Sequence, residues 1–176
     1  MLYTALALLP QNGFAASQGT TGSTSTGTAS LSITKSLQAR ISGISDMTLS
    51  NWTAGDGAVT LHSDVCIYSS TGGYKVTASG SGLLNIFTIN SGLNLLTYTV
   101  EWNDGSSGSL TNSGTSLLAS LPSGAFTGAN SSATDCGGGG NVNARVIVNV
   151  SALAMGLAAS STTPYTGTLT MVVSPN

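Results

Sequence analysis

Charged side chains are scarce in this sequence: four are basic and six are acidic among 176 residues. Soluble domains average about 25% charged residues, so the 6% found here is far below the usual range. The four basic residues, Lys35, Arg40, Lys75 and Arg145, are scattered along the chain. Nucleic acids and anionic membrane surfaces attract clustered Lys and Arg. The composition therefore excludes nucleic acid as a partner and argues against an anionic membrane surface.

The shortage of charge does not predict disorder. Disordered chains combine few apolar residues with high net charge, whereas this chain is 40% apolar with a net charge of −2. Its polar residues are mainly uncharged, with 28 serines, 24 threonines and 23 glycines. Apolar residues can build a core while hydroxyls cover the outside. This balance argues against a typical cytosolic enzyme surface and favours a secreted, β-rich structural protein.

Long apolar runs are also lacking. Leu2–Leu9 is a short one, and the small pair Ala15 and Ala16 follows it. An apolar stretch before small residues predicts a secretory leader over residues 1–16, with cleavage near Ala15 to Ser17. The run is too short to span a bilayer, which takes ~20 residues. The alternative is a buried N-terminal segment of the mature fold.

Cysteine occurs only at Cys66 and Cys136. In an exported protein an even count favours a disulfide between them. The alternatives are two buried thiols or a redox pair. A Cys-x-x-Cys motif is absent, and two cysteines with the single, distant His62 make a poor zinc site.

Apolar and polar residues alternate with period two in several segments of the chain, a pattern typical of half-buried strands. Residues 17–29 form a Gly/Ser/Thr tract expected to be a flexible coil, and we expect a single domain over residues 30–176. Turn signals rich in Gly, Asn and Asp separate the alternating segments, and only residues 152–159 have a helical pattern. The sequence therefore predicts an all-β sandwich or barrel. The alternating segments are Leu31–Ile41, Tyr74–Ala78, Leu96–Trp102, Val146–Val150 and Thr166–Val173, with Val65–Tyr68 and Leu84–Ile89 as shorter candidates.

Catalytic constellations are not evident, and we predict no enzyme activity, cofactor or metal site. His62, Ser63 and Asp64 are consecutive, but neighbouring strand residues point to opposite faces. Glu101 and Asp104 are a weak candidate for a glycosidase pair, because Asp104 is better explained as a turn residue. Trp52 is the aromatic residue that we single out as a candidate ligand contact.

Six segments stand out in order along the chain: Ile41–Met47, Asp64–Ser69, Tyr74–Gly80, Leu96–Trp102, Asn143–Val148 and Tyr165–Val173. Taken in this order, they resemble segments of secreted bacterial fimbrial subunits of the chaperone–usher type, including the spore-coat-protein-U-like branch. The resemblance runs from about Ser30 to the C-terminus. It implies an immunoglobulin-like β-sandwich of about seven strands, either complete in itself or completed by donor-strand exchange with another subunit.

This resemblance implies a non-enzymatic structural subunit of a surface fibre, a pilus or fimbria, exported through the periplasm. Its expected partners are copies of itself or related subunits, a periplasmic chaperone and an outer-membrane usher. The alternative is a monomeric secreted adhesin or carbohydrate-binding module whose ligands are host or surface glycans. Residues 30–41 are either a donor segment or the first strand of their own domain. The candidate donor residues are Leu31, Ile33, Leu37, Ala39 and Ile41.

Overall fold

Strands dominate the computed structural model, which describes residues 16–105, 109–138 and 140–176. Its one α-helix in these ranges, α1 (Ala152–Leu157), begins where Ser151 caps it, at the place where the sequence predicts helix. The all-β fold class is confirmed. The strands are β1 (Ala39–Ser42), β2 (Val59–Ser69), β3 (Tyr74–Gly80), β4 (Thr88–Ser91), β5 (Asn94–Thr97), β6 (Thr99–Asn103), β7 (Thr115–Leu117), β8 (Ala144–Val150) and β9 (Leu169–Pro175).

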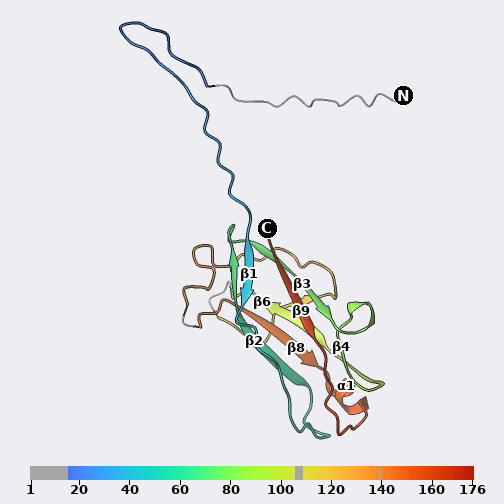
Figure 1. Ribbon diagram of the computed structural model, residues 1–176. Coiled ribbons are helices and arrows are strands. Elements are labelled where there is room, and N and C mark those ends of the chain that lie inside the picture. The colour runs from blue at the N-terminus through green and yellow to red at the C-terminus, as the bar shows by residue number, and fades with distance from the viewer. Residues whose placement is uncertain (1–15, 106–108, 139) are drawn as a thin grey trace, which may run out of the picture. The chain divides into compact units, whose positions relative to one another are not determined.

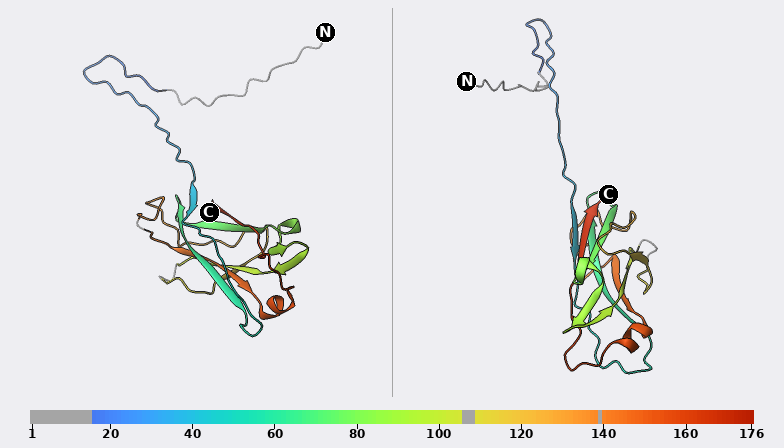
Figure 2. Two further views of the ribbon diagram at one scale, coloured as in Figure 1. Left: turned by 60° about the horizontal axis from the view of Figure 1, so that its bottom comes forward. Right: turned by 90° about the vertical axis from the view of Figure 1, so that its right-hand side faces the viewer.

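The larger sheet has the strand order β1-β2-β8-β6-β7, and every pair in it is antiparallel (Figure 1). The second layer is built around the antiparallel pair of β3 and β9. Residues 119–126 add isolated bridges to β3 on its other side, and the β4–β5 hairpin reaches this layer through a bridge between Asn90 and Thr166. Two further views show β3 and β9 from other sides of the domain (Figure 2).

The core lies between these layers and follows the alternation of the sequence. In β3, Tyr74, Val76 and Ala78 are buried while the residues between them are half-exposed, and in β6 the buried residues are Val100 and Trp102. Side chains that alternate in this way face the opposite layer. The two layers therefore form a sandwich over one core.

An aromatic cluster fills the centre of this core. The indole Nε1–H of Trp102 donates to the Tyr74 hydroxyl at 3.0 Å, so both polar groups are satisfied although the side chains are buried. The Phe126 ring lies 5.5 Å from the Tyr74 ring and 6.4 Å from the Trp102 ring, measured between centroids. Burial raises the pKa of Tyr74 far above its usual value. The phenol is therefore a neutral structural group at physiological pH.

The second half of β2 is buried on both of its faces. Cys66 forms a disulfide with Cys136, which confirms the predicted pairing, with 5.9 Å between the Cα atoms. The Asn143 side chain donates to the carbonyl oxygen of Ile67 and accepts from its backbone N–H, and Asn130 exchanges backbone hydrogen bonds with this part of β2. The segment that carries these groups covers the outer face of the sheet, so Cys66 and Tyr68 are buried as well as Ile67.

The chain divides between Ser36 and Leu37 into two units. In the first, Ser17 and Thr28 exchange backbone hydrogen bonds of 2.9 and 3.0 Å, and the side chains of residues 16–36 are exposed. The second unit begins at Leu37, seven residues after the start that we expected from the sequence. Of the predicted leader, residues 1–15 lie outside the described residues.

Candidate functional site

An open groove lies on the second unit, lined by residues from two widely separated parts of the sequence. One wall is residues 44–49 with Trp52, and the other is residues 164–169. Its volume is about 710 Å³, which is within the range of ligand-binding pockets. Asp46, in the first wall, is the one charged residue among the residues that line it.

The floor of the groove is formed by residues at the edge of the hydrophobic core. Val59, Val148 and Val150 from the larger sheet lie there beside Leu96 and Tyr98. The three valines are 8%, 9% and 6% exposed, compared with 8% for Tyr68 and 9% for Phe126 elsewhere in the core and 0% at its centre. The floor of the groove is therefore buried core that lies near the surface.

The two walls differ in how their backbone is paired. Pairing of β1 with β2 ends at Ser42, and residues 43–52 pair with no strand in the described ranges. In the other wall, Thr166 exchanges backbone hydrogen bonds of 3.0 Å with Asn90 of β4, and Leu169 begins β9, which pairs with β3 along one edge. No described strand is hydrogen-bonded to the second edge of β9, although β1 lies close to β9. Sheet edges are commonly protected by charged residues, yet β9 reads Leu-Thr-Met-Val-Val-Ser-Pro. The second edge of β9 therefore lacks this charged protection.

Trp52, the predicted ligand contact, lies in the wall of the groove and is half-buried. Its ring packs against the core, and its Nε1–H donates to the Gly57 carbonyl oxygen at 3.1 Å. The turn below it is held by Asp56, whose Oδ2 accepts from the Thr53 backbone N–H at 2.6 Å and from its hydroxyl at 2.9 Å. These bonds lower the pKa of Asp56. Trp52 thus has a structural role beside any ligand contact.

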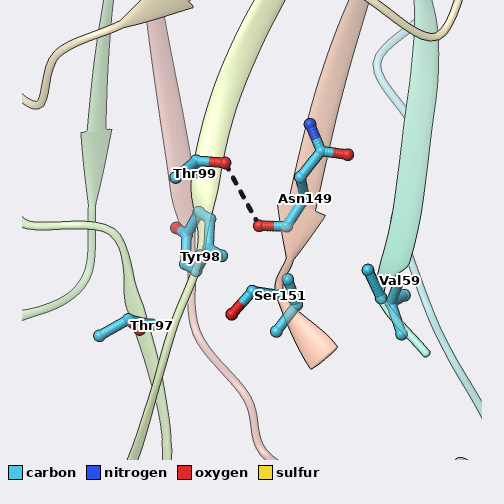
Figure 3. Close-up of a pocket in the computed structure, with 8 residues that line it drawn as sticks. Val59, Thr97, Tyr98, Thr99, Asn149 and Ser151 are labelled. Carbon is cyan, nitrogen blue, oxygen red and sulfur yellow. Dashed lines mark hydrogen bonds between the residues drawn. The ribbon is translucent and has the colours of Figure 1, made fainter. Parts of the chain in front are cut away.

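A smaller cavity of about 410 Å³ lies beside the floor of the groove and shares Val59, Tyr98 and Val150 with it (Figure 3). Its polar groups are used by the fold. Asn149 bonds the hydroxyl of Thr60 at 2.7 Å and the carboxylate of Glu101 at 3.4 Å, its carbonyl accepts from Thr99, and Ser151 caps α1. None of these groups is left to orient a ligand. The lining residues are Ala58, Val59, Thr97, Tyr98, Thr99, Asn149, Val150 and Ser151.

Of the candidate donor residues, Leu31 and Ile33 belong to the first unit, and Leu37, Ala39 and Ile41 belong to the second. Ala39 and Ile41 belong to β1, where they pair with Ser69 and Ile67 of their own domain. Leu31, Ile33 and Leu37 remain 87%, 82% and 67% exposed. Any donor strand must therefore lie before β1, in residues 30–37.

The consecutive residues His62, Ser63 and Asp64 do not form a triad. Ser63 is buried and bonds Ser45, whereas His62 is exposed on the other face of β2. Asp64 makes a two-point ion pair with Arg145, with 2.5 Å from Nε to Oδ1 and 2.9 Å from Nη2 to Oδ2. Hydrogen bonding to Arg145 lowers the pKa of Asp64. The carboxylate is committed to the sheet rather than to His62.

Glu101 is likewise part of the sheet. Its Oε2 accepts from the Gly114 backbone N–H at 3.0 Å, and its Oε1 accepts from the Asn149 amide. These bonds join β6 to its neighbours β7 and β8. They give the Glu101 carboxylate a structural role that requires no catalytic one.

The sequence of this chain matches no protein-family model and no curated protein. The Cys66–Cys136 disulfide is compatible with an exported protein. Among the described residues, no helix is long and apolar enough to cross a membrane.

The groove is the feature that sequence reasoning missed. Ile44, Met47 and Leu49 are apolar but do not alternate, and the other wall precedes β9 by a few residues. The one signal that could have revealed the groove is the order of the strands, because that order places the first and last segments of the domain on either side of one core.

Proposed function

We propose that this chain is a non-enzymatic structural subunit of a bacterial surface fibre, assembled by strand addition. Residues 30–37 of one copy would enter the open groove of the next copy. The observation that carries the proposal is the groove itself, because residues 43–52, which have no strand partner in the described ranges, and the start of β9 flank the edge of the core. Backbone hydrogen bonds to such edges supply affinity, and pockets for alternate side chains supply specificity.

The N-terminal segment has the properties of an occupant for this groove. Leu31, Ile33 and Leu37 share one parity, so in a strand they point to one face. All three are exposed, and burying one such side chain contributes about 1.5–3 kcal/mol. Strand addition would cover both apolar surfaces, those of the segment and of the groove floor.

The other expected partners follow from the same surfaces. An exported subunit with an uncharged, unpaired edge is prone to pair with the wrong strand before assembly. A periplasmic chaperone that covers the groove would prevent such wrong pairing. At an outer-membrane usher, the chaperone would be replaced in the groove by the N-terminal segment of the next subunit. Both remain proposals for this chain, as does its location on the cell surface.

The test compares two substitutions that differ only in the face on which they lie. Ile33→Asp places a carboxylate on the face that would enter the groove, whereas Thr34→Asp places it on the opposite face. We expect exported full-length chain to form high-molecular-weight ladders on unheated SDS gels. Ile33→Asp should abolish them, and Thr34→Asp should leave them within about twofold of the unmodified chain.

Two results would contradict the proposal. One is a chain that stays monomeric and well folded at concentrations where subunits assemble. The other is a deletion of residues 17–36 that still forms the same ladders. The deletion leaves the unit from Leu37 onward intact, so its loss of assembly can be separated from loss of folding by circular dichroism.

A carbohydrate-binding module is the second candidate, and Trp52 favours it. Its ring lies in one wall of the groove and Tyr165 lies in the other, and sugar rings stack on such aromatic faces. Because Trp52 also packs on the core, truncation to Ala would lower stability as well as binding. The discriminating measurement is therefore glycan-array binding by the unmodified chain and by Trp52→Phe. Specific retention of a glycan by the monomer would favour this candidate.

A further inference from the structure

The segment that would enter the groove carries one basic residue on its apolar face. Lys35 has the same parity as Leu31, Ile33 and Leu37, so all four side chains of an extended strand point in the same direction. A strand that inserts Leu31 and Ile33 toward the core therefore directs Lys35 into the groove as well. Taking an ammonium group out of water is unfavourable unless it is paired.

The groove holds one acidic residue to match. Asp46 is the charged side chain among the groove's lining residues, it is exposed, and no described residue forms a hydrogen bond or ion pair with it. The neighbouring lining residues are uncharged: Ile44, Met47 and Leu49 are apolar, and Ser45 and Thr48 carry only hydroxyls, so Asp46 alone can neutralise an ammonium group there.

We infer that Lys35 of one copy pairs with Asp46 in the groove of the next copy, and that this ion pair sets the register of the added strand. The inference rests on the proposed strand addition and commits the groove to a second copy of this chain. A slip of two residues would keep the same face inward but would bring Lys35 against the apolar floor and leave Asp46 unpaired. The free-energy cost of leaving Lys35 and Asp46 unpaired selects a single register of the added strand.

Charge reversal at either position tests the pairing. Lys35→Glu places two acids together and Asp46→Lys places two bases together, so each variant alone should assemble at least about tenfold less than the unmodified chain. A mixture of the two variants restores opposite charges at every junction, because each variant's segment then meets the other's groove. We expect the mixture to recover ladders in which the two variants alternate.

Lys75→Glu is the matched control. It makes the same charge change on a half-exposed residue of β3 outside the groove, and it should assemble like the unmodified chain. Near-normal assembly by the single variants, or failure of the mixture to recover it, would overturn the pairing while leaving strand addition standing. Failure of the unmodified chain to assemble would overturn both.

Discussion

The Cys66–Cys136 disulfide closes a loop of 70 residues, and its removal provides a quantitative test of the fold. The chain-entropy argument gives about 4 kcal/mol for a loop of this length, as an upper value. Single domains are stable by about 5–15 kcal/mol, so the double variant Cys66→Ala/Cys136→Ala should lose a large share of its stability. At roughly 2–4 °C per kcal/mol, the melting temperature should fall by roughly 8–16 °C.

The native structure should nevertheless survive without the bond. Asn143 bonds the backbone of Ile67 at 2.7 and 2.9 Å, and Asn130 exchanges two backbone bonds of 2.9 Å with residues 67 and 69. These contacts hold the covering segment on β2 in the folded state. The effect of the disulfide therefore falls mainly on the unfolded chain.

Equilibrium urea unfolding measures the change, with reduced unmodified chain as the control for the loss of the two sulfur atoms. The variant and the reduced chain should agree within about 1 kcal/mol and should keep the native tryptophan fluorescence. A loss below about 1 kcal/mol, or a native spectrum that changes with the bond, would refute the reasoning.

Two further predictions concern single side chains. Tyr74→Phe removes the acceptor of the buried Trp102 Nε1–H and should lower the unfolding free energy by about 1–3 kcal/mol, and an unchanged value would contradict the role of this bond. The lowered pKa of Asp64 stabilises the fold above about pH 4, and this contribution is lost as the pH falls through the folded-state pKa. Because both partners are partly exposed, it is at most about 1 kcal/mol. Arg145→Met should abolish it in acid-unfolding curves, and an unaltered acid limb would count against it.

Strands with one solvent-facing side could be predicted from sequence because burial imposes period two. Tyr74–Ala78 lies in β3, as expected, whereas the segment Leu96–Trp102, expected as one strand, is divided between β5 and β6 at Tyr98; in both segments the predicted side chains are in the core. The second half of β2 could not be predicted as well, since Val65 to Ser69 are all buried. Their second face is covered by a segment about 70 residues away, and no local pattern reveals such a cover.

The groove depends still more on tertiary structure. Its two walls are more than 100 residues apart in the sequence. Apart from Leu169, which begins β9, the residues of these walls belong to no strand. The sequence did distinguish Lys35 as the break in an apolar alternation. The acid that matches it is visible only after the fold has placed Asp46 in the groove wall.

Site-specific photo-crosslinking gives the most direct test of strand addition. A benzoylphenylalanine in place of Ile33 would be irradiated in assemblies of isotope-labelled and unlabelled chains, and the crosslinked peptides would be identified by mass spectrometry. The groove predicts crosslinks between different copies, from position 33 to residues 44–52 or 164–169. Crosslinks confined to a single copy, or to surfaces outside the groove, would contradict it.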